Sequence, residues 1–261
     1  MTSVAILYIC TGAYDVFWKD FYDSVETKFL PSIEKHYFVF TDSKKIENSD
    51  HIHLIFQERL PWPYPTLFRF KMFNKLHEDL NEFDFIFFMN ANLLVIEMVG
   101  EEILPYAQGL SAVLHPGFYA ENNPDKYTYD RNPRSLAYIP FGQGCRYFMG
   151  GFNGGRAKDF LKMCDTLNRN VDLDLSKGII ALWHDESHLN RYMLNRDPLI
   201  LTPAYGYPEG WKLPFSPKII IRDKNRFGGH DALRGITTSR KTRAVLVPRI
   251  RHIIRRILKK K

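Results

Sequence analysis

The chain is most constrained by short apolar runs that each end abruptly at polar residues. Residues 4–10 form a continuous apolar run that stops at Thr11-Gly12, and residues 83–89 form another that stops at Asn90-Ala91-Asn92. Such runs are typical of strands buried on both faces of a parallel sheet. Between them the sequence predicts helices at about 15–29 and 67–80 and strands at 37–40 and 51–56. This alternation predicts an α/β fold with a Rossmann-like nucleotide-binding sheet in residues 1–100.

Ligands of open α/β sheets bind beyond the carboxyl ends of the strands. The polar residues at 11–12 and 90–92 follow two such ends, so we expect the binding site there. The chain carries no GxGxxG or Walker loop, which removes the main support for a dinucleotide or P-loop site. Residues beyond 100 are richer in loops and glycine.

The chain of 261 residues has a net charge of +7, but this charge lies at its end. Residues 240–261 hold ten Lys or Arg and no acid, which leaves 26 basic and 29 acidic residues in the rest. A nucleic-acid-binding face on the domain is therefore not expected. Cys10, Cys145 and Cys164 form no CxxC pattern and are expected to be free thiols. The first residues resemble a strand and not a signal peptide, so a cytoplasmic protein is expected.

Residues 248–261 alternate isoleucine or leucine with basic residues at helical spacing. An apolar stripe beside a basic face is typical of a helix that lies on an anionic membrane. Peripheral contact with the inner face of the cytoplasmic membrane is therefore expected. A helix packed on its own domain, or a frayed tail, are the alternatives.

The densest group of reactive side chains is Trp-His-Asp-Glu-Ser-His-Leu-Asn at 183–190. Two histidines four residues apart are found in zinc-binding helices, but the HExxH pattern needs Glu directly after the first His, where this chain has Asp185. A plain helix start is another interpretation, with Asp185 as its cap and Leu189, Tyr192 and Met193 on its buried side.

This octapeptide closely resembles the motif of glycosyltransferase family 6, which includes the histo-blood-group A and B transferases and the α-1,3-galactosyltransferases. The segments at 114–119, 127–140 and 147–155 occur in the family's order and approximate spacing. The resemblance covers about residues 4–235 and points to a bacterial-type or viral member. It implies a GT-A fold over residues 1–238, a UDP-binding half at 1–100, a donor-sugar and acceptor half at 101–238, and a separate basic tail at 239–261.

The resemblance also implies a retaining transfer of galactose or N-acetylgalactosamine from a UDP-sugar, in α-1,3 linkage, to an oligosaccharide or glycolipid. Glu186 falls on the catalytic carboxylate, which acts either as nucleophile or as electrostatic stabiliser of an oxocarbenium ion. The donor positions are Ile9, Cys10, Thr11, Tyr14, Arg69, Asn90, Ala91, Asn92, Met149, Gly150, Gly151, His184, Asp185, Lys224 and Arg234. The acceptor positions are His115, Thr128, Trp183 and, more weakly matched, Glu209.

The chain departs from the family's pattern at residues 90–92. Animal members carry Asp-x-Asp there and hold Mn²⁺ against the pyrophosphate, whereas this chain has Asn90-Ala91-Asn92. Amide oxygens are neutral and bind a hard dication more weakly than carboxylates. No metal cofactor is therefore expected, and Lys224 and Arg234 of the family's mobile segment are expected to offset the charge on UDP. Asparagines that merely shape a turn, and a solvated basic loop, are the alternatives.

The family selects its donor at the position of Gly151, where glycine leaves the most space for an acetamido group. UDP-N-acetylgalactosamine is therefore favoured over UDP-galactose, which remains the alternative donor. A non-catalytic glycan-binding protein and a UDP-sugar hydrolase are the rival functions. Residues 222–235 are expected to be mobile without UDP.

Overall fold

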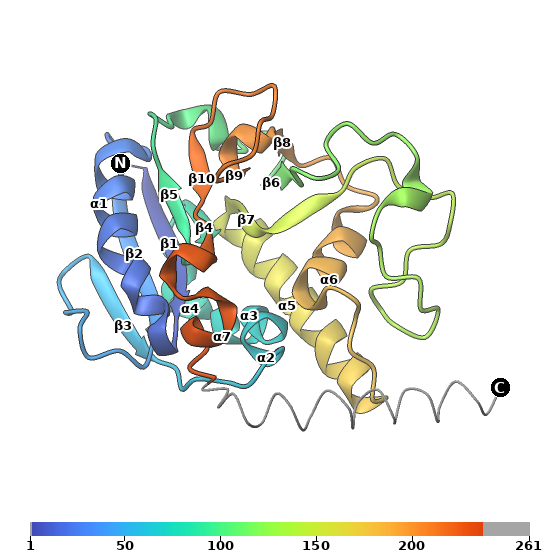
Figure 1. Ribbon diagram of the computed structural model, residues 1–261, viewed down its shortest axis with the longest axis horizontal. Helices are drawn as coiled ribbons and strands as arrows, with labels where there is room; N and C mark the ends of the chain where they lie inside the picture. The colour runs from blue at the N-terminus through green and yellow to red at the C-terminus, as the bar shows by residue number, and fades with distance from the viewer. Residues whose placement is uncertain (1, 237–261) are drawn as a thin grey trace. The chain divides into compact units, whose positions relative to one another are not determined.

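The computed structural model describes residues 2–236 and contains a sheet of seven strands in the order β3-β2-β1-β4-β7-β6-β8 (Figure 1). The strands are β1 (Ser3–Cys10), β2 (Glu34–Thr41), β3 (Ile52–Phe56), β4 (Phe85–Met89), β6 (Leu110–Leu114), β7 (Phe148–Arg156) and β8 (Leu199–Leu201). β7 pairs antiparallel with both of its neighbours, and the other pairs in this sheet are parallel. This mostly parallel sheet between helices confirms the predicted α/β class and fits a GT-A fold.

The apolar run at the start of the chain forms β1, an inner strand of the sheet between β2 and β4. Every residue of β1 from Val4 to Tyr8 is fully buried, because both faces of the strand are covered. On one face of β1, the ring of Tyr8 packs against the ring of Phe21 of α1 (Trp18–Lys28), with ring centroids 4.3 Å apart. Leu7, the preceding residue, points to the other face and belongs to the core there. The unbroken apolar pattern of this run therefore reflects two covering layers.

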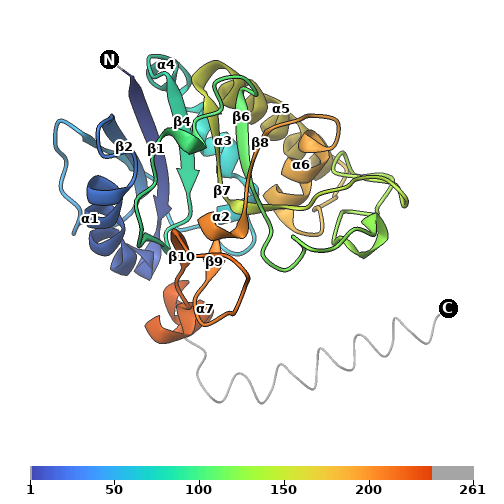
Figure 2. The ribbon, with the colours of Figure 1, turned by 90° about the horizontal axis from the view of Figure 1, so that it is seen from above.

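The opposite face is covered by a layer of helices that includes α5 (Ala157–Ser176) and α6 (His184–Met193) (Figures 1 and 2). Phe160 of α5 is fully buried and lies in one core with Phe73, Leu7 of β1 and Phe88 of β4. The predicted buried side of α6, formed by Leu189, Tyr192 and Met193, lies in the same core and is confirmed.

The helix predicted over 67–80 is wrong in one respect, because the segment is divided into short helices. They are α2 (Tyr64–Leu67), α3 (Arg69–Asn74) and α4 (His77–Asn81). Phe68 and Leu76 separate them with backbone angles near the bridge region, at φ −94° and −113°. The reorientation at these two residues lets Phe70, Met72, Phe73 and Leu80 all reach one core. Tertiary packing thus prevails over the continuity of a helix.

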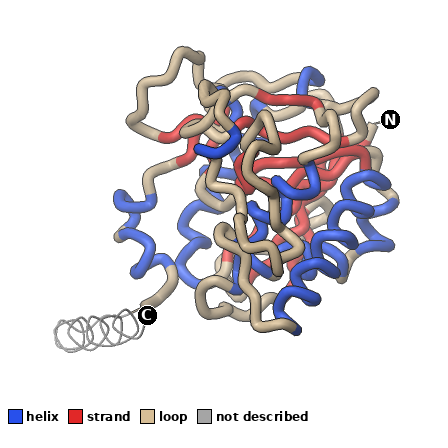
Figure 3. The backbone as a smooth tube through the Cα atoms, turned by 90° about the vertical axis from the view of Figure 1, so that its right-hand side faces the viewer, coloured by secondary structure: helices blue, strands red, loops and turns tan. Residues whose placement is uncertain are grey.

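The other predicted elements occur close to their expected bounds. The helix expected at 15–29 is α1, preceded by the 3₁₀ helix η1 (Gly12–Phe17), and the strands expected at 37–40 and 51–56 are β2 and β3. The remaining elements of the body are η2 (Glu101–Ile103), η3 (Pro124–Lys126), η4 (Pro203–Tyr205) and a small sheet of β5 (Leu93–Val95), β10 (Ile219–Ile221) and β9 (Tyr207–Pro208). Long loops join several of them, drawn in tan in Figure 3. The cysteines Cys10, Cys145 and Cys164 are free thiols.

The chain divides into two units, residues 1–223 and 224–261. The described part of the second unit contains η5 (Lys224–Phe227) and α7 (Gly229–Leu233). The amphipathic pattern at 248–261 lies outside the described residues. Among the described residues, none of the helices is both long and apolar enough to cross a membrane.

Replacing Phe160 by alanine is expected to destabilise the first unit by about 3–5 kcal/mol, because a fully buried ring would leave a cavity between the helices and the sheet. Leu173→Ala is the matched control, since Leu173 lies on the same helix but is exposed, and its cost is expected to stay within about 0.5 kcal/mol. Urea unfolding followed by circular dichroism measures both. Equal losses in the two variants would contradict the described packing of α5.

Candidate functional site

Several chain segments meet at the carboxyl edge of the central strands. β4 ends there at Met89 and β6 ends there at Leu114, while the antiparallel β7 begins there at Phe148, as the pairings Met89↔Phe152 and Leu114↔Phe148 show. The first turn of α6 lies against the start of β7, because Glu186 accepts a hydrogen bond from the amide of Gly150. The motifs found in the sequence at 90–92, 147–151 and 183–186 are therefore neighbours in space.

A buried ion pair between Arg69 and Asp185 joins these segments. The guanidinium Nη1 of Arg69 donates to Asp185 Oδ2 at 2.6 Å and to the carbonyl of Gly150 at 2.7 Å. Its Nη2 donates to Asn90 Oδ1 at 3.3 Å. Burial raises the pKa of Asp185, and the neighbouring Arg69 opposes this shift. One arginine therefore connects α3 to the end of β4, the start of β7 and the start of α6.

The asparagines at 90 and 92 have different environments. Asn90 lies beside Arg69 and beside Gly151, where a Cβ added to the glycine would come within 2.9 Å of Asn90 Nδ2. Asn92 is buried, and its Nδ2 donates to the carbonyl of Arg222 at 2.8 Å. Ala91 is buried between them and its carbonyl accepts a hydrogen bond from the Tyr8 hydroxyl. Asn90 therefore belongs to the edge of the site, whereas Asn92 fastens the chain beyond β10 to this turn.

The residues of this turn do not fit a site for a hard divalent cation. Mg²⁺ and Mn²⁺ prefer carboxylate oxygens, whereas the turn offers the neutral amides of Asn90 and Asn92. The Asn90 oxygen, which could bind an ion, already accepts from Arg69 Nη2. Within residues 2–236, the acids, histidines and cysteines form no metal-binding group at this turn. The cation next to Asn90 is the guanidinium of Arg69.

The carboxylate of Glu186 has two donors and a raised pKa. Its Oε1 accepts from the Tyr147 hydroxyl at 2.8 Å and its Oε2 accepts from the Gly150 amide at 2.7 Å. Although the side chain keeps some exposure, protein atoms crowd its carboxyl group, and this burial raises the pKa of Glu186 to about 7. The two donors favour the charged form and hold the pKa below the value that burial alone would give.

Gly150 allows this close approach of β7 to the carboxylate. A Cβ at residue 150 would come within 3.2 Å of the Cβ of Glu186 and within 3.3 Å of Asp185 Oδ2. Contacts of this length are tight, so a larger residue would press β7 and α6 apart. Met149, which precedes it, is buried and lies next to Gly151.

Asp185 does not cap α6, because Trp183 occupies the N-cap position. The helix begins at His184, which makes Asp185 the second helical residue, and its carboxylate bonds Arg69 instead. The alternative interpretation of Asp185 as a capping residue is therefore wrong. His184 has φ of +52°, a left-handed conformation that is costly for a residue with a Cβ, and its ring contacts Trp62. The neighbouring Trp183 is exposed at the surface.

Two residues that the sequence predicts to contact the glycan acceptor, His115 and Thr128, both lie next to Tyr147. Thr128 forms a side-chain hydrogen bond with the Tyr147 hydroxyl, and the His115 ring lies 5.5 Å from the Tyr147 ring in an edge-on arrangement. His115 Nδ1 accepts a hydrogen bond from the Gly117 amide, and burial lowers the pKa of His115 to about 4. His115 is therefore neutral at physiological pH, with its proton on Nε2. Burial raises the pKa of Tyr147, so its hydroxyl stays a donor.

The remaining predicted positions lie in several other elements of the chain. Cys10 ends β1 and is buried, and Ile9 packs against the core. Thr11 directly precedes η1 and Tyr14 lies within it, and both are partly exposed. β1 pairs with β4, so this turn follows the strand beside Asn90. Glu209 accepts a hydrogen bond from the Asp223 amide. Lys224 and Arg234 belong to the second unit and lie in or next to its short helices.

Two residues important to the site were not identified in the sequence as site residues. Tyr147 donates to the carboxylate of Glu186, and Asn190 attaches α6 to β7 by accepting from the Phe148 amide and donating to the Phe148 carbonyl. Both stand inside the motifs at 147–155 and 183–190. Asn190 lies one helical turn after Glu186 on the same face, and this spacing was the available signal.

The chain is similar in sequence to known glycosyltransferases. Residues 1–225 match the family model of glycosyltransferase family 6. The chain is 36% identical over 225 residues to the O-antigen biosynthesis glycosyltransferase WbnI of Escherichia coli, covering 85% of this chain and 95% of that protein.

Animal proteins are also similar. The histo-blood group ABO system transferase 2 of Rattus norvegicus is 31% identical over 225 residues, covering 80% of this chain and 66% of that protein. The globoside α-1,3-N-acetylgalactosaminyltransferase 1 of Gallus gallus is 28% identical over 236 residues, covering 84% and 65%. The chain thus spans about two thirds of the length of these animal relatives. With its motifs assembled at one edge of the sheet and its first 225 residues matching the family model, the chain belongs to glycosyltransferase family 6.

Proposed function

We propose that this glycosyltransferase moves N-acetylgalactosamine from UDP-N-acetylgalactosamine, in α-1,3 linkage and with retention of configuration, to a galactoside acceptor, without a divalent metal. The observation that carries the proposal is the position of the Glu186 carboxylate. It accepts hydrogen bonds from Tyr147 and Gly150, at the point where the family motifs at 147–155 and 183–190 meet. Relatives named as α-1,3-N-acetylgalactosaminyltransferases support the donor and the linkage.

In the proposed reaction, Glu186 must be ionised when the bond between the sugar and UDP breaks. Positive charge develops at the anomeric carbon, and a carboxylate on its face stabilises this charge or bonds covalently to the carbon. Both routes give retention, because the acceptor hydroxyl then arrives on the face that UDP left. The donors from Tyr147 and Gly150 hold the two carboxylate oxygens in fixed directions. The buried arrangement therefore needs little reorganisation during the reaction.

The proposal that no metal is needed depends on the side chains at residues 90–92, which would be the metal ligands. The amides of Asn90 and Asn92 replace the carboxylates that would bind a dication, and Arg69 provides a fixed positive charge beside Asn90. The ion pair with Asp185 keeps the Arg69 guanidinium charged in the protein interior. This positive charge stands beside Asn90, where animal members of the family would hold a metal ion. Lys224 and Arg234 are proposed to add positive charge towards the departing diphosphate.

Release of UDP from UDP-N-acetylgalactosamine in EDTA, with and without fucosyllactose, tests the proposal. We expect release that fucosyllactose stimulates and EDTA leaves intact, and Glu186→Gln is expected to lower it by about 100-fold or more, because a neutral amide cannot balance the developing charge. Glu82→Gln, at an exposed carboxylate on the surface, is the control and is expected to keep wild-type activity.

The outcomes separate the parts of the proposal. Activity that returns only with added Mn²⁺ would refute metal independence and leave sugar transfer intact. Release that fucosyllactose does not stimulate would favour a UDP-sugar hydrolase, and no release under any condition would favour a non-catalytic glycan-binding protein.

The pH profile is expected to follow the ionisation of Glu186. Since burial raises its pKa to about 7, kcat/KM should rise as the pH increases through about 7. Tyr147→Phe removes a donor to the charged form, so the midpoint should move to higher pH by about one unit. Tyr129→Phe is the control, because the Tyr129 hydroxyl donates to the Arg146 carbonyl in the same aromatic cluster. The role assigned to Tyr147 is excluded if both variants keep the wild-type midpoint.

Donor selection is expected to depend on Gly151. A methyl group at this position would press on Asn90 Nδ2 and Met149 Cε, each 2.9 Å away. Gly151→Ala should therefore lower kcat/KM for UDP-N-acetylgalactosamine about 10-fold more than for UDP-galactose. Competition between the two donors in one reaction gives the ratio directly. A wild-type enzyme that prefers UDP-galactose would establish the alternative donor and overturn this assignment.

A further inference from the structure

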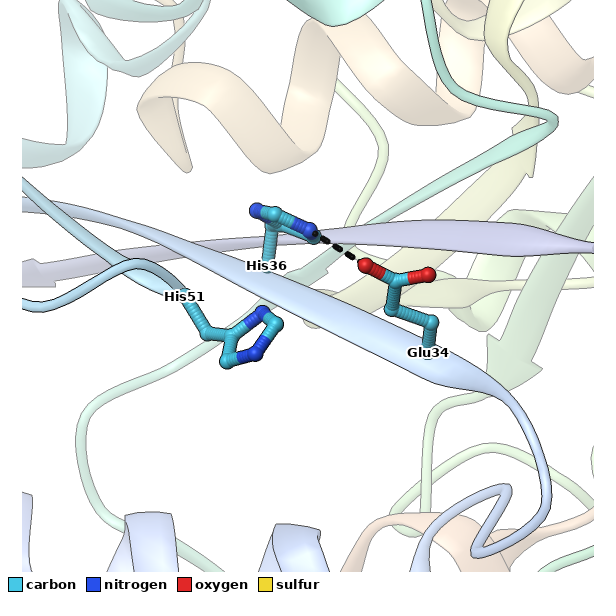
Figure 4. A group of neighbouring side chains, drawn as sticks. All are labelled: Glu34, His36 and His51. Atoms are coloured by element: carbon cyan, nitrogen blue, oxygen red, sulfur yellow. Dashed lines mark hydrogen bonds and ion pairs between the residues drawn. The ribbon is translucent and has the colours of Figure 1, made fainter.

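A cluster of histidines lies on the sheet, away from the proposed catalytic site. Glu34 and His36 open β2, His51 directly precedes β3, and His53 is the second residue of β3 (Figure 4). These are the amino ends of the two strands, whereas the catalytic motifs gather beyond carboxyl ends. The backbone fixes the cluster, because the amide of Tyr37 donates to the His51 carbonyl at 2.7 Å and Phe38 pairs with His53.

The side chains of Glu34, His36 and His51 converge. One oxygen or nitrogen atom from each lies within 4.8 Å of those of the other two. Figure 4 shows the His36 ring between the other two side chains, with its Nε2 at 3.1 Å from Glu34 Oε1. Ligands around a tetrahedral zinc ion are separated by about 3.3 Å, given bonds of about 2.0–2.1 Å. The pair His36 and Glu34 is already at this spacing, and the exposed His51 needs a small movement towards them.

A fourth residue holds the central histidine in the orientation that a metal would need. His36 Nδ1 lies 3.0 Å from His53 Nε2, and the two rings are parallel, 4° from coplanar orientation. When His36 donates from Nδ1 to His53, its Nε2 lone pair faces Glu34 and His51. Histidines that bind metals commonly donate their other ring nitrogen to such a partner, which fixes the tautomer and increases the affinity. Phe38 and Phe83 pack against these rings and restrict their motion.

The charges around the cluster suit a cation. Lys35, between Glu34 and His36, points to the other face of the strand, where its Nζ donates to the carbonyls of Leu30 and Ile33. Asp79 on α4 adds a negative charge near His53. The cluster thus presents two imidazoles and one carboxylate as ligands, with solvent open to a fourth position.

We propose that Glu34, His36 and His51 bind a late divalent transition-metal ion, with Zn²⁺ as the representative ion and His53 as the positioning residue. Imidazole nitrogen with one carboxylate favours zinc over the hard ions Mg²⁺ and Mn²⁺. The ion fastens the amino end of β3, the edge strand of the sheet, to β2. Its role is structural, so it is independent of the proposed transfer reaction and of its metal requirement.

Zinc binding to the full chain without an affinity tag tests the proposal. After treatment with EDTA and exchange into metal-free buffer, Zn²⁺ is titrated by calorimetry and thermal unfolding is recorded with saturating Zn²⁺ and with Mg²⁺. The wild type is expected to bind Zn²⁺ stoichiometrically and to gain about 5 °C in Tm when free Zn²⁺ reaches about 100 times Kd, while Mg²⁺ gives no shift. The shift is expected because the ion binds the folded chain more tightly than the unfolded chain.

Variants distinguish this cluster from other histidines. His51→Ala is expected to abolish stoichiometric binding and the shift in Tm, and since His51 is exposed, its Tm without metal should match the wild type. His53→Ala should weaken the affinity by about 10- to 100-fold without abolishing it. His77→Ala, at a half-exposed histidine on α4 near Glu78 and Asp165, should bind like the wild type. Wild-type protein that binds no Zn²⁺, or His51→Ala protein that binds it with unchanged affinity, overturns the proposal, whatever the transferase assay gives.

Discussion

The site depends on the buried ion pair between Arg69 and Asp185. Both side chains are almost completely buried, and each alone would be a costly charge in the interior. Together they tie α3 to α6, and the further bonds of Arg69 to Gly150 and Asn90 draw β7 and the end of β4 to the same point. Loss of either partner would leave an uncompensated charge and release Glu186, the next residue of α6, from its fixed place.

The carboxyl group of Glu186, beside this ion pair, lowers the stability of the folded chain when it ionises. Because the folded state raises the pKa of Glu186 to about 7, the folded chain holds its proton more tightly than the unfolded chain. Stability therefore declines as the pH rises from the ordinary pKa of a glutamate towards 7, where the charge must be accommodated. The left-handed backbone of His184, two residues earlier, adds a second local cost. Both costs fall in the first turn of α6, which carries Glu186.

The strands β1 to β4 were predictable because their signal is local. Apolar runs such as that of β1 are typical of a strand covered on both faces, and the motif at 183–190 identified the family. The breaks at Phe68 and Leu76 were not predictable, because the helical spacing of 67–80 is compatible with one helix until the core is known. The same holds for Tyr147 and for the amide of Asn92, whose partners lie 39 and 130 residues away.

The reversed direction of β7 has a consequence for how such an enzyme can diversify. Because β6 ends and β7 begins at the same edge, the whole of residues 115–147 forms one excursion whose base is closed by the His115 amide donating to the Tyr147 carbonyl. Insertions or exchanges within this excursion leave the register of the sheet intact. Residues 115–146 can therefore vary in length and sequence without a change in the strand order, while Tyr147 at the base of the excursion keeps its hydrogen bond to Glu186.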